Sequence, residues 1–360
     1  MDQNSSLPAG QKPVLIVPYV WIGDFVRCHS VVKLLRMAAP DRPVDMVSST
    51  LCAPLADYMP GVRQTIVIDF PRRRLGVALQ RELAAQIADG DYGHALVMSR
   101  KWKAALAPWL AGVPVRTGFA GEMRFGLLND VRFGERKLAR MIDQMGTLAL
   151  PRGATLPADW PLPELKVQPE ELSRWRANNG LPEQSKPIVA LCPGAVGAGK
   201  AWPVSHYAAL ARALTNDGAA VWVLGGPNET STARQIAEVG GSGVRDLTGS
   251  DLRDAILALA AADVSVTNDS GLMHVSAAIG TSTIAIFGPT SPWHQKPLNP
   301  LTAILEPPGD QAAAQRARTE GNDAVAHRRT DDVAPAAVRA AVQAALGGRL
   351  DPPIRRSKTL

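Results

Sequence analysis

Short apolar runs alternate with amphipathic stretches along both halves of this 360-residue chain. In the first half, four apolar runs of strand length lie at residues 14–17, 44–47, 65–68 and 95–98. Stretches with a helical repeat of apolar positions follow them, at residues 25–37, 53–58, 75–88 and 102–111. Strands that alternate with helices at this spacing are typical of parallel βαβ units. The pattern therefore predicts a doubly wound α/β domain.

A second series of the same kind begins near residue 188, beyond a proline-rich segment. Seven prolines lie within residues 151–187, and we expect this segment to be mainly a connection with one short helix at 169–178. Strands are then predicted at 187–191, 220–224, 263–266 and 283–287, and helices at 205–214, 229–239, 252–262, 272–279 and about 333–346. No clear repeat covers residues 309–326, which we expect to be irregular.

These elements predict an α/β protein with two Rossmann-like doubly wound domains, at residues 1–160 and 188–332. A linker at 161–187 joins them, and a helix with a tail follows at 333–360. Ligands of open α/β sheets bind beyond the carboxyl ends of the strands. We therefore expect the two domains to face one another across a ligand-binding cleft.

A polar turn at residues 268–271 is the first candidate for chemistry. It contains Asp269, Ser270 and Gly271, and the helix that follows carries His274 about one turn from its start. Free backbone N–H groups at the start of a helix, together with the helix dipole, bind anions, so a diphosphate is a natural ligand here. Asp or Ser at such a place can equally serve only as an N-cap, and the turn alone leaves both interpretations open.

A glycine-rich loop after the strand at 187–191 is the second candidate. It contains Gly194 and ends with Lys200 and Trp202. Glycine lets backbone amides approach phosphate oxygens, and a lysine adds a mobile positive charge. The loop is not a Walker loop, because no Ser or Thr follows the lysine. Its alternative interpretation is a solvated lysine on a surface loop.

Glu229 follows another glycine-containing turn, after the strand at 220–224. A carboxylate at this place can accept hydrogen bonds from ribose hydroxyl groups, as in dinucleotide sites. It is equally compatible with an acidic residue in the first turn of a helix, where the dipole favours negative charge.

Positive charge is concentrated in the first half of the chain. Residues 1–160 contain 20 Lys and Arg against 14 Asp and Glu, whereas the remaining 200 residues contain 19 of each. We expect the first domain to meet an anionic partner, and a solvated basic face is the alternative. Nucleic acid is not favoured, because the sequence predicts neither a basic helix nor a sheet with interleaved aromatic residues.

Other classes of site are disfavoured by what the sequence lacks. No apolar run is long enough to cross a bilayer, and residues 1–13 lack the features of a secretory signal. Cys28, Cys52 and Cys192 are scattered without metal-site spacing, and we expect them to be reduced, as in a cytoplasmic protein. The one Asp-x-Asp sequence, at 89–91, precedes a strand at its amino end, away from the expected cleft, so we expect no metal site.

Four stretches of the chain resemble one known family. They are PYVWIGDFVRCHS (18–30), RTGFAGEMRFGLLND (116–130), CPGAVGAGKAWP (192–203) and TNDSGLMH (267–274). They resemble the ADP-heptose:lipopolysaccharide heptosyltransferases of glycosyltransferase family 9, and most of all their heptosyltransferase II branch. The glycine-rich loop is about one residue shorter than in that family's pattern, and Ala201 stands where an arginine is usual.

The resemblance implies a GT-B fold and an inverting transfer of L-glycero-D-manno-heptose from ADP-heptose to heptosyl-Kdo2-lipid A of the lipopolysaccharide inner core. The partners would be ADP-heptose and an anionic lipid A–Kdo acceptor, at the inner face of the inner membrane, without cofactor or metal. The last helix would fold back onto the first domain. A transferase for another nucleotide sugar, an epimerase of the same fold and a non-catalytic ADP-sugar-binding protein are the alternatives.

The resemblance also assigns roles to individual residues. Asp24, on a glycine turn after the first strand, would take the proton of the acceptor hydroxyl, although by position it can also cap a helix that begins at residue 25. Lys200 would stabilise the departing diphosphate. The expected donor-binding residues are Gly194, Lys200, Trp202, Glu229, Asp269, Ser270, Gly271 and His274. The expected acceptor-binding residues are Lys101, Arg116 and Arg124.

Overall fold

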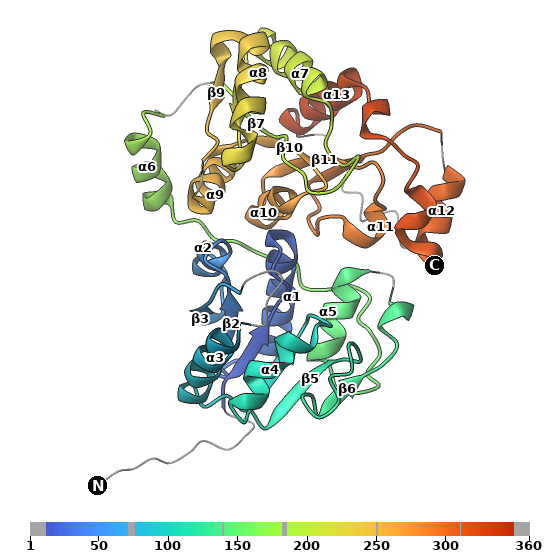
Figure 1. The fold of residues 1–360 in the computed structure, drawn as a ribbon. Coiled ribbons are helices and arrows are strands. Elements are labelled where there is room, and N and C mark those ends of the chain that lie inside the picture. Colours follow the sequence, from blue (N-terminus) through green and yellow to red (C-terminus); the bar gives the residue numbers. More distant parts are fainter. Residues whose placement is uncertain are drawn as a thin grey trace. The chain divides into compact units, whose positions relative to one another are not determined.

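The computed structural model describes residues 12–70, 76–138, 140–181, 186–249, 251–309 and 311–348. The chain divides into two compact units, Met1–Pro163 and Glu164–Leu360, and each unit contains a six-stranded sheet (Figure 1). Our expectations for the first eleven residues and for the tail beyond residue 348 lie outside the described residues. In the described part of the chain, no helix combines the length and the apolar character that a membrane span needs.

Unit 1 is built on a parallel sheet with the strand order β3-β2-β1-β4-β5-β6. Its strands are β1 (Val14–Val17), β2 (Val44–Ser48), β3 (Val62–Val67), β4 (His94–Val97), β5 (Val115–Phe119) and β6 (Asp130–Arg132). Its helices are α1 (Ile22–Ala38), α2 (Ala53–Asp57), α3 (Val77–Asp89), α4 (Trp102–Leu110) and α5 (Met141–Ala149), with the short 3-10 helix η1 (Glu135–Lys137). Leu15 of β1 packs with Leu83 of α3 and Ala105 of α4 in one buried cluster, so the apolar runs of the sequence form the core.

Unit 2 has the strand order β12-β11-β10-β7-β8-β9, again parallel. Its strands are β7 (Ile188–Cys192), β8 (Ala220–Val223), β9 (Val244–Asp246), β10 (Val264–Asn268), β11 (Ser282–Ile286) and β12 (Thr302–Leu305). The longer helices are α6 (Pro169–Asn178), α7 (Val204–Asn216), α8 (Thr230–Gly240), α9 (Leu252–Ala261), α10 (Gly271–Ile279), α12 (Gln311–Glu320) and α13 (Pro335–Leu346). Shorter helical turns are η2 (Pro227–Glu229), η3 (Gly241–Gly243), α11 (Pro292–Gln295), η4 (Gly321–Val325) and η5 (Thr330–Asp332).

The strand order reverses once in each unit, between β1 and β4 in unit 1 and between β7 and β10 in unit 2. Ligands of open α/β sheets bind beyond the carboxyl ends of the strands at such a reversal. The segments that follow β1, β7 and β10 carry Asp24, Lys200 and Ser270, respectively. The predicted α/β fold with two doubly wound sheets is therefore confirmed, and it places these three residues at the edges where ligands are expected.

Several elements differ from the prediction. α1 begins at Ile22, three residues earlier than expected, so Gly23 and Asp24 belong to the helix and not to a turn before it. The strands β5, β6, β9 and β12 were missed, since they are short and most of them carry charged side chains. α12 occupies a segment that we expected to be irregular. Its small apolar residues Ala313 and Ala317 are buried in a local apolar cluster.

Two segments that we expected to connect or cross between domains pack onto unit 2. Trp175 Nε1 in α6 donates to Asp254 Oδ1 at 2.9 Å, so part of the predicted linker is bound to α9. Val338 and Val342 of α13 are fully buried in the core of unit 2. The expectation that the last helix folds back onto the first domain is therefore wrong, because its apolar stripe is already covered within unit 2.

Candidate functional site

Asn268, the last residue of β10, fixes the glycine-rich loop that follows β7. Its side chain is fully buried, and its Nδ2 donates to the Pro193 carbonyl at 2.7 Å. Its Oδ1 accepts hydrogen bonds from the Trp202 N–H and the Tyr207 hydroxyl, both at 3.1 Å. One amide thus holds both ends of the loop. The sequence predicted Asn268 only as part of a turn. Its position at the end of β10, the strand that pairs with β7, is the feature that could have indicated its contact with the loop after β7.

A second support of the loop comes from Thr330, which the sequence did not single out. Thr330 Oγ1 donates to the Ala201 carbonyl at 2.8 Å, and this threonine is 1% exposed. Gly199 has a φ of +74°, a conformation that side-chain-bearing residues rarely adopt, so a glycine is required there. The loop is consequently an ordered feature in which Lys200 has a defined position.

Lys200 forms an ion pair with Asp269 just before the start of α10. Its Nζ lies 2.6 Å from Asp269 Oδ2, and the two side chains are 24% and 7% exposed. Asp269 Oδ2 also accepts a hydrogen bond from Thr290 Oγ1 at 2.8 Å. The structure therefore supports the interpretation in which the carboxylate orients the lysine, and it argues against a freely solvated Lys200.

The first turn of α10 has no side-chain cap. Ser270 occupies the N-cap position with an extended backbone, and its hydroxyl makes no cap hydrogen bond. Among the described residues, Ser270 Oγ is buried and has no hydrogen-bond partner. His274 lies one turn into the helix and is 5% exposed. The alternative in which Ser270 simply caps the helix is therefore wrong, and the hydroxyl is a donor beside the N–H groups at the helix start.

Glu229 lies against the glycine-rich loop. A methyl group built on Gly194 would approach Glu229 Cδ to 3.1 Å, so the small residue allows this carboxylate its place. Glu229 Oε2 accepts a hydrogen bond from the Gly226 N–H at 2.8 Å. Glu229 thus accepts a backbone N–H in the turn before α8, in line with its interpretation as an acidic residue at the start of a helix. It also lies next to Gly194, another predicted donor-binding residue.

Trp202 is the one predicted donor-binding residue that the structure removes from the site. Its ring is 1% exposed and packs edge-on against Tyr207, with the centroids 4.9 Å apart. Its Nε1 donates to the Val333 carbonyl at 2.8 Å. The indole is enclosed in the core of unit 2 and leaves no face for a ligand, so it anchors the loop instead of binding the donor.

Asp24 lies in the first turn of α1, at the third helical residue. The N-cap is Trp21, which makes no side-chain cap hydrogen bond. Arg27 Nη2 donates to Asp24 Oδ1 at 2.6 Å, and the two residues are 5% and 9% exposed. The alternative in which Asp24 caps a helix starting at residue 25 is therefore wrong, because the helix has already begun and the carboxylate is paired with Arg27.

Tyr19 shares the electrostatic environment of Asp24. Burial raises the pKa of its phenol well above the ordinary value, and the carboxylates of Glu135 and Asp24 raise it further. Burial also raises the pKa of Glu135, although Arg100 opposes the shift. Tyr19 consequently keeps its proton throughout the physiological range and is a hydrogen-bond donor near the candidate base.

Two of the three predicted acceptor-binding cations have structural roles. Arg124 is 2% exposed and donates to the backbone carbonyls of Phe119 and Ser99, and burial lowers the pKa of its guanidinium. Arg116 lies near the amino end of β5, away from the ligand-binding edge, and its Nε donates to the Leu127 carbonyl at 2.7 Å. Their prediction as acceptor-binding residues is therefore wrong, because backbone carbonyls already occupy these guanidinium groups.

Lys101 differs from these arginines. It follows β4 at the ligand-binding edge, its side chain is 73% exposed, and its Nζ lies 2.5 Å from Glu122 Oε1. Lys101 is thus the predicted acceptor-side cation that solvent and ligands can reach.

The Asp-x-Asp sequence at 89–91 is placed as expected, before β4 at the amino edge of the sheet. Asp89 ends α3, and Asp91 forms an ion pair with Lys12 at 2.7 Å. Within the described ranges, no group of three or more His, Cys, Asp or Glu side chains has the arrangement of a metal site.

Comparison with known proteins gives a consistent result. Residues 80–325 match glycosyltransferase family 9 (heptosyltransferase). The chain is 33% identical over 304 residues to lipopolysaccharide heptosyltransferase 2 of Escherichia coli K12, covering 81% of this chain and 87% of the relative. It is 32% identical over 306 residues to lipooligosaccharide heptosyltransferase 2 of Haemophilus influenzae, covering 81% and 88%.

Solved structures agree with the sequence relatives. The structure of E. coli ADP-heptose lipopolysaccharide heptosyltransferase II superposes with a TM-score of 0.81 at 30% identity, covering 93% of this chain and 99% of that one. The E. coli heptosyltransferase WaaC with ADP superposes with a TM-score of 0.73 at 20% identity, covering 92% and 99%, and supports the fold alone.

Proposed function

The chain belongs to glycosyltransferase family 9, the heptosyltransferases, and we propose that it moves L-glycero-D-manno-heptose from ADP-heptose to heptosyl-Kdo2-lipid A. The proposed donor is supported by the 30% identity to a solved enzyme that is called an ADP-heptose transferase. The observation in this structure that carries the proposal is the Lys200–Asp269 pair just before the uncapped start of α10.

Stabilisation of the departing diphosphate is the role that we assign to unit 2. Negative charge grows on ADP as the glycosidic bond breaks, and preorganised cations and N–H donors stabilise it more than they stabilise the bound donor. Lys200 supplies the cation, and the first N–H groups of α10 with the Ser270 hydroxyl supply donors. Asp269 keeps the ammonium in place, so it acts on the diphosphate through Lys200.

Recognition of the ribose is the role that we assign to Glu229. One of its oxygens, Oε2, is engaged by the Gly226 N–H, which fixes the orientation of the carboxylate. The other oxygen is then the acceptor for ribose hydroxyl groups, as in dinucleotide sites. Gly194 leaves room for this arrangement, because any larger residue would press on the Glu229 side chain.

Proton transfer is the role that we assign to Asp24. In an inverting displacement, the acceptor hydroxyl oxygen attacks the anomeric carbon from the face opposite ADP, and the electrons of the broken bond leave with ADP. The hydroxyl proton passes to a base as the new bond forms. Arg27 engages Asp24 Oδ1, so we propose that Oδ2 receives the proton.

The acceptor is proposed to meet unit 1, in which the excess of positive charge lies. The acceptor is an anionic lipid, which would place the enzyme at the inner face of the inner membrane. Lys101 is the remaining candidate for an acceptor contact among the three predicted cations, because its side chain is exposed at the carboxyl edge of the sheet.

A panel of donors tests the proposal. The protein is incubated with heptosyl-Kdo2-lipid A and, in turn, ADP-heptose, ADP-glucose and UDP-glucose, and release of the nucleoside diphosphate is followed. We expect rapid, acceptor-dependent release from ADP-heptose and little from the others. Preference for another sugar would favour a related transferase, and tight donor binding without turnover would favour a binding protein.

A further inference from the structure

Three large apolar side chains project from unit 1 close to one another. Met123, Phe125 and Phe133 are 89%, 71% and 70% exposed. Phe125 lines one shallow depression with Ala120, whose N–H donates to the carbonyl of Arg132, the neighbour of Phe133, at 2.8 Å. We refer to Met123, Phe125 and Phe133 as the apolar patch. Met123 and Phe125 lie in the segment between β5 and β6, and Phe133 directly follows β6.

The backbone holds the apolar patch outward. Glu122 and Met123 have φ values of +33° and +48°, which residues with side chains rarely adopt and which cost free energy. Each phenylalanine precedes a glycine of positive φ, Gly126 or Gly134, at +85°. Lys101 pairs with Glu122 and ties the strained turn to the start of α4. Such a conformation persists only where the surrounding fold imposes it, so the exposure of these side chains is part of the fold.

Basic side chains surround the apolar patch. The segments 99–103 and 120–137, which ion pairs join, contain seven Lys and Arg against three Asp and Glu. The exposed cations of these segments are Arg100, Lys101, Arg136 and Lys137. All three acidic side chains are paired: Glu122 with Lys101, Glu135 with Arg100, and Asp130 with Arg132 and Arg152. The patch therefore carries a net positive field.

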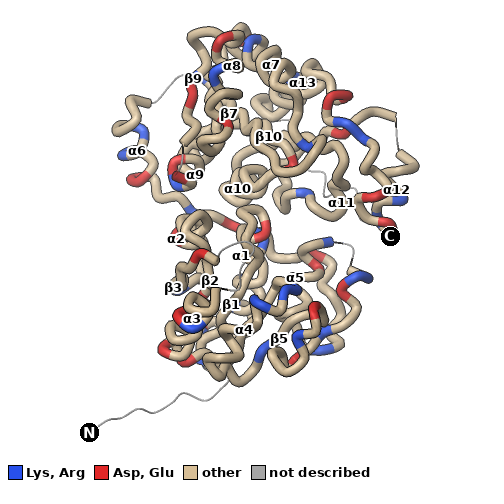
Figure 2. Tube along the Cα trace, in the orientation of Figure 1, with Lys and Arg blue, Asp and Glu red and all other residues tan. Residues whose placement is uncertain are grey.

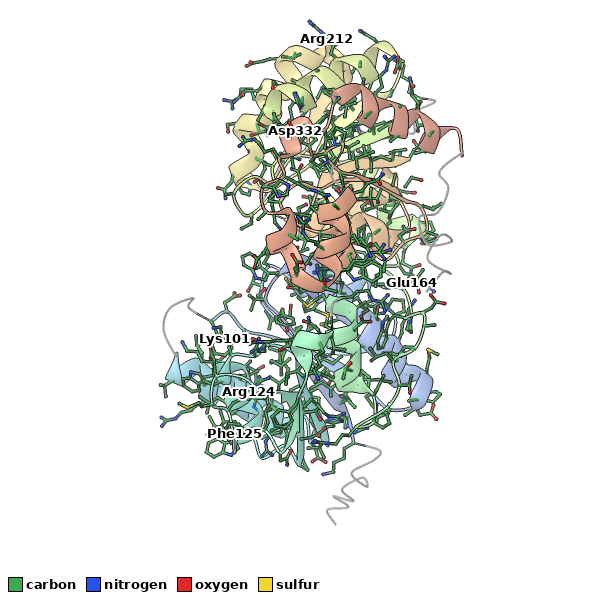
Figure 3. All side chains as sticks on the ribbon, turned by 90° about the vertical axis from the view of Figure 1, so that its right-hand side faces the viewer. Lys101, Arg124, Phe125, Glu164, Arg212 and Asp332 are labelled. Carbon is green, nitrogen blue, oxygen red and sulfur yellow. The ribbon has the colours of Figure 1, made fainter. Side chains whose placement is uncertain are left out.

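The figures show the same grouping. Lysine and arginine positions gather around β5 and the neighbouring α4 and α5 in unit 1 (Figure 2). Lys101, Arg124 and Phe125 lie on one flank of this unit, with Phe125 at its periphery (Figure 3). Of these three, Arg124 is engaged by the backbone, so Lys101 and Phe125 are the ones that solvent reaches.

Projecting apolar side chains with cations around them have the chemistry of a bilayer-docking surface. The apolar groups enter the boundary between headgroups and acyl chains, and the cations meet anionic headgroups. A stable protein–protein interface needs on the order of 1,000 Å² or more of complementary surface, which three projecting side chains do not supply. We propose that the apolar patch and its four exposed cations dock unit 1 on the surface of a bilayer that contains anionic lipid.

This inference rests on the proposed function for its biological purpose, since a lipid acceptor lies in a membrane. Its measurement is independent of transfer. The full-length protein is sedimented with vesicles of phosphatidylcholine, with and without phosphatidylglycerol. We expect strong binding only to the vesicles that contain phosphatidylglycerol, and weaker binding as salt screens the cations.

Two pairs of substitutions test the two parts of the surface. Phe125→Ser with Phe133→Ser should lower the partition coefficient at least about tenfold, because two apolar anchors are lost. Arg136→Gln with Lys137→Gln should lower it about 25-fold, at about fivefold for each cation near an anionic surface. Either pair alone is sufficient for the test if the other fails to fold, which the thermal unfolding midpoint reports.

Matched controls come from exposed residues elsewhere. Trp109→Ser with Leu110→Ser removes side chains of 44% and 46% exposure from the end of α4. Arg212→Gln with Arg234→Gln removes two exposed cations of unit 2. Both controls should bind vesicles as the unaltered protein does. Equal losses in controls and patch variants, or no preference for phosphatidylglycerol, would overturn the docking surface.

Transfer to a de-acylated, water-soluble acceptor separates the two proposals. The patch variants should retain this activity, because none of the substituted residues belongs to the proposed catalytic or binding machinery. Vesicle binding that depends on the patch, together with no transfer in the unaltered protein, would retain the docking surface and reject the proposed function.

Discussion

At the residue scale, the candidate groups of both units are held by a charged partner. Lys200 is paired with Asp269, and Asp24 with Arg27. An ammonium group has three N–H donors, so one bond to Asp269 leaves two for other oxygen atoms. A carboxylate bound at one oxygen likewise keeps the other oxygen in a defined direction. The two ion pairs thus orient Lys200 and Asp24 before a substrate binds, although each pair partly neutralises the charges of its members.

Lys200→Ala tests the cation at the diphosphate. A hydrogen bond to a charged group contributes about 1.5–3 kcal/mol. We therefore expect kcat/KM for the donor to fall about 10–150-fold, at about 1.36 kcal/mol per factor of ten. Part of the loss should appear in kcat, since the charge on the diphosphate grows in the transition state. Steady-state kinetics with varied donor measure it, and the exposed Lys186→Ala serves as the control. Unchanged donor kinetics in Lys200→Ala would make this lysine a loop residue without a catalytic role.

Asp24→Asn tests the base. Loss of a positioned general base should lower kcat by about 10²–10⁴-fold and leave the donor KM nearly unchanged. The substitution also breaks the buried ion pair between Asp24 and Arg27, which destabilises the fold. The double variant Asp24→Asn with Arg27→Gln removes both charges, so it should recover thermal stability while remaining inactive. Recovery of activity together with stability would assign Asp24 a structural role only, and the exposed Asp41→Asn is the control for charge.

At the scale of elements, the glycine-rich loop depends on β10 more than on its own sequence. Asn268 is the link, because it holds the Pro193 carbonyl and the Trp202 N–H together. The loop therefore carries Lys200 to the start of α10 only while β7 and β10 remain paired, as their register shows.

Asn268→Ala tests this coupling. Three hydrogen bonds of a buried amide are lost, and each buried partner left unsatisfied costs about 1–3 kcal/mol. We expect a clear decrease in the thermal unfolding midpoint and a donor KM that rises at least about tenfold as the loop loosens. The ADP affinity, measured by calorimetry, should fall in parallel. An Asn268→Ala protein with lower stability but unaltered donor affinity would show that the loop is held without this residue.

The sequence predicted which loops lie at the carboxyl edges of the sheets better than it predicted which atoms surround individual side chains. Asp24, Lys200 and Ser270 were placed correctly because βαβ alternation determines which loops share the carboxyl edge of a sheet. The burial of Trp202 and Arg124 was not predictable. Their residue types fit a ligand site as well as a core, and only the fold shows which backbone carbonyls lie within reach of a guanidinium or an indole.

The position of the last helix shows the same limit. Its pattern predicted α13 well, but not the surface on which it packs. Val338 and Val342 would suit either domain, since an apolar stripe specifies only that it must be covered. The neighbouring Val333 carbonyl accepts a hydrogen bond from the Trp202 indole Nε1–H, so the placement of α13 also completes the support of the glycine-rich loop.

At the scale of the whole molecule, acid stability should depend on His94 in unit 1. Burial lowers the pKa of His94 to about 4, and the cations Arg42 and Arg132 act in the same direction. Its Nε2 is hydrogen-bonded to Thr117 Oγ1 at 2.8 Å. Because the folded state disfavours the protonated ring, the unfolded chain binds a proton first as the pH falls below about 6.5. Unit 1 should therefore lose stability between about pH 6.5 and 4, by up to roughly 3 kcal/mol.

His94→Gln should remove most of this acid dependence. Glutamine can still hydrogen-bond to Thr117 but does not take up a proton in this range. Hydrogen exchange of the β4 amides at pH 7 and pH 5 measures the local stability, and the exposed His327→Gln is the control. If protection in the His94 variant falls with acid as much as in the unaltered protein, His94 is not the group that titrates.

Transfer of the sugar itself is the central claim for the whole molecule, and product analysis tests it most directly. The protein is incubated with ADP-heptose and heptosyl-Kdo2-lipid A, and both ADP and the extended acceptor are quantified by mass spectrometry. The account predicts that the two products form in equal amounts, only when both substrates are present, and that Lys200→Ala and Asp24→Asn slow both equally. Release of ADP without an extended acceptor, or an acceptor that is never extended at saturating ADP-heptose, would contradict it.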